Sequence, residues 1–156
     1  MKNMIVLILM VINIVLVIIL ANTLTPHTCP LPSPVELQGR TFDDLLDAIE
    51  WVESRGDSNA VGDNGRAVGS FQIHHCYIED VRWGKDSFKD SDRLNKAKSR
   101  EIVRCYLSRY ATYYRLGHYP TFEDFARIHN GGPNGWKKDC TKPYWLKVKA
   151  RLNSSE

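Results

Sequence analysis

The sequence predicts a mainly helical α+β domain with one small β-hairpin, preceded by an apolar N-terminal segment. Three observations support this prediction. Apolar residues recur at helical spacing in several stretches after residue 40, a turn-forming triplet separates two short apolar pairs, and residues 4–21 are almost unbroken aliphatic. Spacing of three to four residues is typical of an amphipathic helix, whereas a short turn between apolar pairs is typical of a hairpin.

The N-terminal apolar segment predicts a targeting or anchoring role. Residues 4–21 are Ile, Val, Leu, Met and Ala, with Asn13 as the one polar interruption. This length is short for a membrane-spanning helix and long for the core of a cleaved signal. Residues 1–21 are therefore either an uncleaved signal anchor, which we favour, or a signal peptide. Because Lys2 is the only charge before Glu36, the remaining chain is expected outside the cytoplasm, membrane-anchored through a single N-terminal helix or secreted.

Residues 22–39 are predicted to form a linker and residues 40–156 a single domain. Four prolines fall between residues 25 and 34, which is typical of a stiff, extended spacer. The stretch that follows is long enough for one hydrophobic core and too short for two.

The spacing of the cysteines and histidines indicates whether the chain can form disulfides or bind a metal ion. The four cysteines are Cys29, Cys76, Cys105 and Cys140. Outside the cytoplasm they are free to form disulfides, and four cysteines allow three pairings that the sequence does not distinguish. No two of them have the spacing of a zinc site. His74, His75 and His129 lack a further regularly spaced ligand, so no metal or other cofactor is predicted.

Charge is distributed unevenly along the domain. Residues 36–80 hold ten acids and three bases, whereas residues 81–156 hold seventeen bases and eight acids. The basic half suits an anionic polymer or surface, although a solvated helix face is the simpler explanation. No aromatic and basic motif predicts binding to nucleic acid.

The first helix is predicted to begin after Thr41 and to end at Gly56. Thr41 and Asp44 have the spacing of a capping box. Apolar residues follow at helical spacing, namely Phe42, Leu45, Leu46, Ile49 and Val52. Glu53 comes four residues after Ile49 and falls on the same apolar stripe, whereas Glu50 lies at its edge.

The triplet of residues 63–65, Asp-Asn-Gly, predicts the turn of a hairpin between the apolar pairs at 60–61 and 67–68. Residues 71–81 are then expected to form a second helix. Residues 91–116 are expected to form the longest helix, ended by Gly117. Its inward positions are predicted to be Leu94, Ala97, Ile102, Cys105, Tyr106, Arg109, Tyr110 and Tyr113.

Two further helices are predicted near the C-terminus. Thr121 and Asp124 repeat the capping pattern before an apolar stretch, and residues 130–135 are expected to form a loop. Thr141 is predicted to cap the last helix, with Pro143 in its first turn. The inward positions of that helix are predicted to be Trp145, Val148 and Leu152.

Glu53 is a candidate general acid for glycoside cleavage. Cleaving a glycosidic bond needs a proton at the leaving oxygen, and removal from water keeps a carboxylic acid protonated near neutral pH. A Glu on an apolar stripe at a helix end suits this task, although a solvent-facing carboxylate is the structural alternative. Gln72 offers a donor and an acceptor to a sugar, and Gly69 allows close backbone approach. Residues 130–132, Asn-Gly-Gly, are a possible second binding loop or a plain turn.

Three segments together resemble a known superfamily. Residues 53–54, 69–73 and 129–132 resemble, in order, the three signatures of soluble lytic transglycosylases and goose-type lysozymes. Residues 125–135 and 106–111 are similar to segments of invertebrate-type, destabilase-like lysozymes, as are Tyr144 and Trp145.

The resemblance implies a lysozyme-like fold and cleavage of the β-1,4 linkage between N-acetylmuramic acid and N-acetylglucosamine in peptidoglycan. It implies Glu53 as the general acid and Asp63 as a second carboxylate, with Asp57 as the alternative to Asp63. The implied substrate-binding residues are Ser54, Ser70, Gln72, Ile73, His129, Asn130, Gly131, Gly132 and Tyr144.

Several functions remain compatible with these residues. Hydrolysis is expected if Asp63 reaches the cleft, and lytic transglycosylation with an anhydro end is expected if it does not. The substrate is peptidoglycan or a related amino-sugar polymer such as chitin. A non-catalytic polysaccharide-binding module is one alternative. A structural membrane protein that assembles through Cys29 is another.

Overall fold

The computed structural model describes residues 39–82 and 88–154. The predicted N-terminal segment at 1–21 and all but the last residue of the predicted linker lie outside the described residues. Within them, the structure is mainly helical with a single two-stranded antiparallel sheet, which confirms the predicted class. None of the helices in these two ranges has the length and apolar character needed to cross a membrane. A single domain over residues 40–156 remains a prediction.

Helix α2 (Phe42–Ser54) begins and ends where the sequence predicts. The Thr41 hydroxyl accepts a hydrogen bond from the Asp44 backbone N–H, and Asp44 accepts one from the Thr41 backbone N–H. This capping box satisfies two backbone donors that a helix leaves free. The helix ends as Arg55 and Gly56 adopt left-handed backbone conformations, with φ of 58° and 86°. Both ends of α2 are therefore fixed by local sequence.

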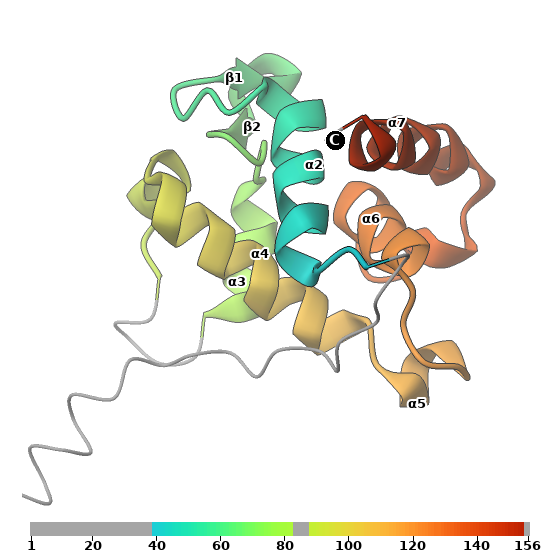
Figure 1. Ribbon diagram of the computed structural model, residues 1–156. Coiled ribbons are helices and arrows are strands. Elements are labelled where there is room, and N and C mark those ends of the chain that lie inside the picture. The colour runs from blue at the N-terminus through green and yellow to red at the C-terminus, as the bar shows by residue number, and fades with distance from the viewer. Residues whose placement is uncertain (1–38, 83–87, 155–156) are drawn as a thin grey trace, which may run out of the picture.

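The predicted hairpin lies at the C-terminal end of α2 (Figure 1). Strand β1 (Val61–Gly62) pairs antiparallel with β2 (Ala67–Val68), so that Val61 faces Val68 and Gly62 faces Ala67. The short 3-10 turn η1 (Asp63–Gly65) joins them. Its three residues all have positive φ values, which favours Asp, Asn and Gly at these positions.

The helix predicted over 71–81 is shorter than expected, because α3 spans only His75–Val81. Before it, Ile73 forms an antiparallel bridge with Val68, and Gln72 has a left-handed φ of 48°. The chain therefore turns back onto the hairpin before the helix begins.

The predicted long helix at 91–116 is also wrong, because it is divided into three pieces. A 3-10 turn η2 (Asp90–Leu94) precedes α4 (Lys96–Tyr110), whose first turn is capped by the Asn95 side chain. Ala111 leaves the helical conformation, and α5 (Tyr113–Leu116) follows. Gly117 ends it with a φ of 80°, as predicted. Four residues that were predicted to face inward are exposed to solvent instead, namely Leu94, Ala97, Arg109 and Tyr113.

Helix α6 (Phe122–Gly131) opens with the predicted capping box of Thr121 and Asp124. It continues two residues into the stretch at 130–135 that was predicted to be a loop. Because the helical turn extends to Gly131, Asn130 and Gly131 are held on a helix end.

The last helix, α7 (Lys142–Asn153), follows two 3-10 turns, η3 (Gly135–Lys137) and η4 (Asp139–Thr141). Thr141 is the N-cap residue of α7, as predicted, but its side chain makes no capping hydrogen bond. Its hydroxyl is buried, accepts a hydrogen bond from Arg127 Nε and lies 2.8 Å from the Gly135 carbonyl oxygen. The predicted inward residues of α7 are buried, namely Trp145, Val148 and Leu152.

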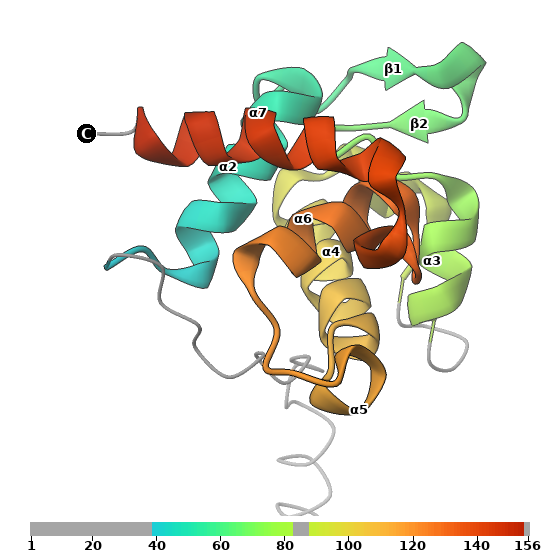
Figure 2. The same cartoon turned by 90° about the vertical axis from the view of Figure 1, so that its right-hand side faces the viewer.

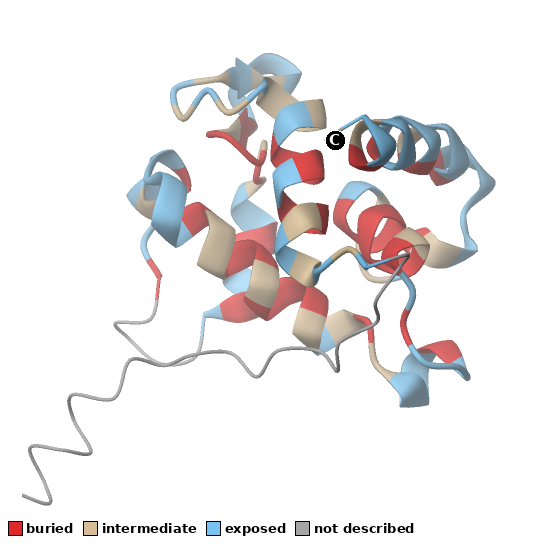
Figure 3. Ribbon diagram, viewed as in Figure 1, coloured by how far each residue is buried: buried red, intermediate tan, exposed pale blue. Residues whose placement is uncertain are grey.

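The core lies where α2 packs against α6 and α7, and where α4 packs against α3 and α6 (Figures 1 and 2). Buried residues gather on the facing sides of these helices (Figure 3). The largest fully buried side chains include Leu45, Leu46, Ile49, Phe71, Ile78, Ile102, Phe125 and Ile128. Burial of each such side chain contributes about 1.5–3 kcal/mol.

No disulfide joins two cysteines of the described ranges, because Cys76 and Cys140 are exposed free thiols. Cys105 is buried in α4. Cys29 lies outside the described residues, so the disulfide pairing remains a prediction.

Candidate active site

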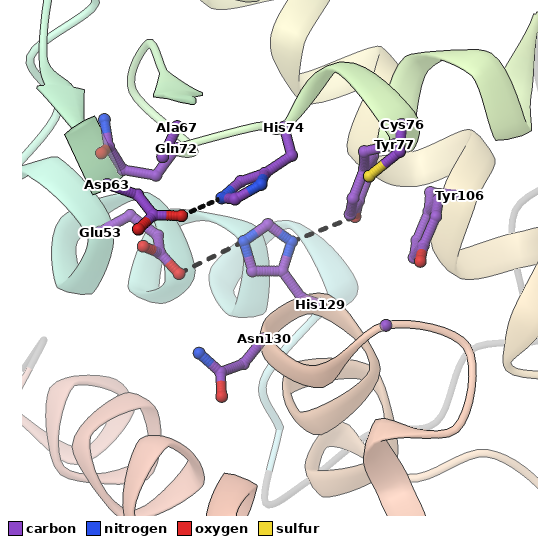
Figure 4. A pocket seen from close by; sticks show the side chains of 11 residues that line it. Glu53, Asp63, Ala67, Gln72, His74, Cys76, Tyr77, Tyr106, His129 and Asn130 are labelled. Carbon is purple, nitrogen blue, oxygen red and sulfur yellow. Dashed lines mark hydrogen bonds and ion pairs between the residues drawn. The ribbon is translucent and has the colours of Figure 1, made fainter. Parts of the chain in front are cut away.

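A cleft of about 420 Å³ lies between the hairpin, α3 and the end of α6 (Figure 4). Its lining comes from four separate parts of the sequence, namely Glu53, Asp63, Ala67, Gln72, His74, Cys76, Tyr77, Tyr106, His129, Asn130 and Gly132. Within the described ranges, no three His, Cys, Asp or Glu side chains gather in a way that could hold a metal ion. The lining offers carboxyl, imidazole, amide, phenol and thiol groups.

Glu53 reaches the cleft from the last turn of α2. Its side chain is 18% exposed, and its Oε1 lies 3.4 Å from Nε2 of His129. Glu50, predicted at the edge of the apolar stripe, is more deeply buried than Glu53 and contacts Lys96 at 3.3 Å. Glu50 is not part of the cleft lining. Among the acids of α2, Glu53 is thus the one that a bound ligand would meet.

His129 lies behind Glu53, on the last turn of α6. Its side chain is only 4% exposed. Its Nδ1 lies 3.1 Å from the Tyr77 hydroxyl, so the two ring nitrogens face two different polar partners (Figure 4). Phe71 lies edge-on to the imidazole, with ring centroids 6.5 Å apart. This packing fixes the ring plane.

Tyrosines form the inner wall of the cleft. Tyr77 stacks on Tyr106 with their ring centroids 3.5 Å apart. Burial, followed by the neighbouring Tyr106 and Glu53, raises the pKa of Tyr77 well above its ordinary value. Burial and the Glu53 carboxylate likewise raise the pKa of Tyr144. Both phenols therefore keep their protons at neutral pH.

Tyr144, expected to contact substrate, lies behind His129 and is not part of the cleft lining. Its ring centroid is 6.3 Å from that of His129. Its hydroxyl is buried and lies near enough to the Glu53 carboxyl for the two groups to interact. Tyr144 is thus placed to support His129 and Glu53.

Asp63, expected as the second carboxylate, lies on the same cleft as Glu53. Its Oδ2 is 3.2 Å from His74 Nε2, and its Oδ1 accepts a hydrogen bond from Arg66 at 2.9 Å. Asp57, the alternative, is outside the lining and instead accepts a hydrogen bond from the Asn59 backbone N–H. Of the two, Asp63 is the carboxylate that shares a cavity with Glu53.

Gln72 lines the cleft, and its amide also holds the hairpin. Its Nε2 donates to the carbonyl oxygens of Gly69 and Ala60 at 2.9 and 3.2 Å. A Cβ at Gly62 would lie 2.3 Å from Gln72 Oε1. Glycine is therefore required at position 62 for Gln72 to sit where it does.

Besides Tyr144 and Gly131, three further residues expected to bind substrate lie away from the cleft lining. The Ser54 hydroxyl donates to the Ser70 carbonyl oxygen at 2.8 Å and joins α2 to the segment at 69–73. Ser70 is fully buried, and its hydroxyl has no hydrogen-bond partner among the described residues. Ile73 is a core residue. These residues shape the wall that carries Gln72.

The end of α6 supplies the opposite wall. Asn130 and Gly132 line the cleft, whereas Gly131 packs against Thr141, whose methyl group would lie 2.5 Å from a Cβ there. Lys138 Nζ donates to the Gly131 carbonyl oxygen at 2.6 Å. Two residues of the Asn-Gly-Gly triplet thus face the cavity, and the middle one is needed for packing.

The sequence pointed to neither Tyr77 nor His74 as a cleft residue. They are three residues apart at the start of α3, and this spacing places both on one helix face. Cys76, Tyr106 and Ala67 carry no local pattern that distinguishes them from core or surface residues.

The model of the family described as Destabilase matches residues 43–151 of this chain. The chain belongs to the destabilase family. The matched range contains every residue of the cleft lining.

Similar proteins and similar solved structures agree with that assignment. An invertebrate-type lysozyme of Ruditapes philippinarum is 44% identical over 51% of this chain and 56% of its own length. Lysozyme 1 of Crassostrea virginica is 36% identical over 56% of this chain and 46% of its own length. The matched part thus spans about half the length of these two curated relatives.

The fold is similar to that of solved lysozymes. The crystal structure of Tapes japonica lysozyme superposes with a TM-score of 0.57 at 36% identity, covering 68% of this chain and 86% of that one. Meretrix lusoria lysozyme, in a complex with Aeromonas hydrophila PliI, gives a TM-score of 0.58 at 34% identity and covers 69% of this chain and 87% of its own. The lysozyme-like fold implied by the sequence is confirmed.

Proposed function

We propose that this destabilase-family chain is a glycoside hydrolase of the lysozyme type. Its substrate would be the β-1,4 linkage between N-acetylmuramic acid and N-acetylglucosamine in peptidoglycan, with Glu53 as the general acid. One observation carries the proposal: the Glu53 carboxyl lies at a helix end, mostly removed from solvent, on a cleft and against a buried histidine. The similarity to proteins named lysozyme supports this substrate class.

Glu53 would deliver its proton to the leaving glycosidic oxygen as the bond breaks. The transition state of such a cleavage has positive charge on the sugar ring, which a second carboxylate stabilises. Asp63 shares the cleft and would act as the nucleophile or as the base that activates water. His74 and Arg66 both contact Asp63 and hold its carboxylate at the cleft. Two carboxyls with separate partners thus support separate roles.

The remaining lining would orient the glycan. Gln72, Asn130 and the backbone of Gly132 would offer hydrogen bonds to hydroxyl and N-acetyl groups. Ser54, Ser70 and Ile73 would act indirectly, by holding the segment that carries Gln72. The domain would work outside the cytoplasm, anchored through residues 1–21 or secreted.

Lytic transglycosylation is the second candidate. In that reaction Glu53 would act first as acid and then as base, and the sugar's own hydroxyl would attack to leave an anhydro end. The presence of Asp63 in the cleft favours hydrolysis over this route.

Mass spectrometry of the products from purified peptidoglycan tests both candidates. We expect the full-length chain to release fragments with a reducing N-acetylmuramic acid end. Glu53→Gln is expected to abolish release, because the amide has no acidic proton to deliver, whereas Glu101→Gln on α4 is expected to keep it. Fragments with anhydro ends would show that the reaction is transglycosylation and not hydrolysis. Unchanged activity of Glu53→Gln would refute the role of Glu53, and binding to peptidoglycan without any product would make the chain a binding module.

A further inference from the structure

The contact between His129 and Glu53 raises the question of which imidazole nitrogen carries the proton. A neutral imidazole has one N–H donor and one acceptor nitrogen, and the partner of one nitrogen decides the state of the other. In this protein Nδ1 faces the Tyr77 hydroxyl at 3.1 Å, and Nε2 faces Oε1 of Glu53 at 3.4 Å. The three groups form a chain that runs from α3 through α6 to α2 (Figure 4).

We infer that Tyr77 is a positioning residue that acts on Glu53 through His129. By donating its hydroxyl proton to Nδ1, Tyr77 holds the imidazole in the tautomer that carries its proton on Nε2. The Nε2–H then points at Oε1 of Glu53 and engages that oxygen. The acidic proton of Glu53 is thereby left on Oε2, free to be given to the glycosidic oxygen. This inference rests on the proposed role of Glu53 as the general acid.

The surroundings of Tyr77 support a donor role. The residue is buried, and its ring stacks on Tyr106. Burial raises its pKa well above the ordinary value, so the hydroxyl keeps its proton across the neutral range. A buried hydroxyl loses free energy when its proton finds no acceptor. Nδ1 of His129 is the acceptor that lies within hydrogen-bond distance of this hydroxyl.

The groups around His129 favour the same arrangement. Glu53 approaches from α2, Tyr77 from α3 and Tyr144 from α7. The first accepts a hydrogen bond at Oε1, and the second donates one to Nδ1. The Tyr144 hydroxyl interacts with the Glu53 carboxyl, whereas Nδ1 of His129 faces Tyr77. The Nε2 to Oε1 distance is long for a hydrogen bond, and such contacts commonly tighten when substrate binds.

The opposite tautomer would work against catalysis. With its proton on Nδ1, His129 would present a bare Nε2 to Glu53 and would accept the proton that the glycosidic oxygen needs. Removing the Tyr77 hydroxyl therefore allows both tautomers, and only one of them leaves the acid free. The loss is comparable to one net hydrogen bond, so kcat is expected to fall about tenfold.

Nitrogen NMR of the histidine ring in the full-length chain tests the tautomer without any substrate. In the wild-type protein we expect a protonated Nε2 and an unprotonated Nδ1 on His129, and in Tyr77→Phe a mixture of both tautomers. Tyr114→Phe removes an exposed hydroxyl and is expected to change neither. A wild-type His129 protonated on Nδ1, or a tautomer unchanged in Tyr77→Phe, would overturn the inference even if the chain proved to have another activity.

Steady-state kinetics on soluble peptidoglycan fragments test the consequence. Tyr77→Phe keeps the ring and its stacking, and it is expected to lower kcat about tenfold with KM within about twofold. Tyr114→Phe is expected to keep both values. A rise in KM with unchanged kcat would show that Tyr77 contacts substrate, and it would overturn the positioning role. Unfolding midpoints of the two variants, if equal to wild type, exclude a loss of folded protein.

Discussion

The Ser54 hydroxyl donates a hydrogen bond to the Ser70 carbonyl oxygen at 2.8 Å. This bond joins the residue that follows the candidate acid to the segment that carries Gln72. It also crosses between two walls of the cleft, because α2 supplies one wall and residues 69–73 contribute to the other. The Ser54 side chain thus links the two walls directly beside Glu53.

Ser54→Ala is expected to reduce the free energy of unfolding by about 1 kcal/mol, because a partly buried hydrogen bond is lost. It is also expected to lower kcat, since the Gly69–Ile73 segment can then shift relative to Glu53. Urea unfolding and steady-state kinetics measure the two effects. Ser154→Ala removes an exposed hydroxyl that bonds to the Arg151 carbonyl oxygen, and it serves as the control. Equal losses in both variants would contradict the role given to Ser54.

Asp63→Asn is expected to lower kcat by a factor on the order of 100, because the amide can neither attack the sugar nor accept a proton from water. Asp57→Asn is the matched control, since Asp57 lies outside the cleft lining. Kinetics on peptidoglycan fragments compare the two variants. If Asp63→Asn kept full activity, Asp63 would have no catalytic role, and the transglycosylase route would become the better account.

Gly69→Ala is expected to unfold far more easily than Gly117→Ala. Both glycines have a φ near 80°, so alanine strains the backbone at each site. At Gly69 the added Cβ would lie 1.9 Å from the Arg93 carbonyl oxygen, whereas at Gly117 it would meet nothing within 4 Å. The clash is expected to cost about 1–3 kcal/mol beyond the shared backbone strain. Chemical denaturation of both variants measures this difference, and equal stabilities would refute the close packing at Gly69.

The pair of His75 and Asp90 is expected to make stability depend on acid pH. The hydrogen bond from His75 Nδ1, together with the Arg93 guanidinium, holds the pKa of Asp90 below its ordinary value of 3.8. A carboxyl with a lowered folded-state pKa contributes stability above its unfolded pKa and loses it as the pH falls through the folded value. The wild-type protein should therefore lose stability below pH 3.8 more steeply than Asp90→Asn. Denaturation midpoints across the acid range measure this, and parallel curves would contradict it.

Local signals predicted the helix ends but not the connections between them. The capping boxes at Thr41 and Thr121 and the stop at Gly117 each involve residues within four positions of one another, so the sequence alone contains them. The turn before α3 depends on the bridge from Ile73 to Val68. Helical spacing over 71–81 carried no sign of this pairing. The break at Ala111 was likewise invisible in the apolar pattern.

The sequence pointed to the two carboxylates that line the cleft, but it did not point to the residues that contact and position them. Glu53 lies on a stripe that the sequence displays, and Asp63 lies in a recognisable turn. The partner of His129, by contrast, is 52 residues away, and only the folded chain brings Tyr77 to it. Ser70 and Ile73 belong to the predicted segment, yet their burial follows from tertiary packing. The motifs thus located the segments, and the structure shows which of their residues line the cleft.

The two helices that carry Glu53 and His129 both start from a Thr and Asp capping box. Glu53 lies twelve residues after Thr41, and His129 lies eight residues after Thr121. Because each helical residue adds a rotation of about 100°, inserting or deleting one residue between cap and cleft would swing either group out of the cavity. The outer faces of these two helices can therefore vary in composition, but the number of residues between each cap and the cleft cannot change.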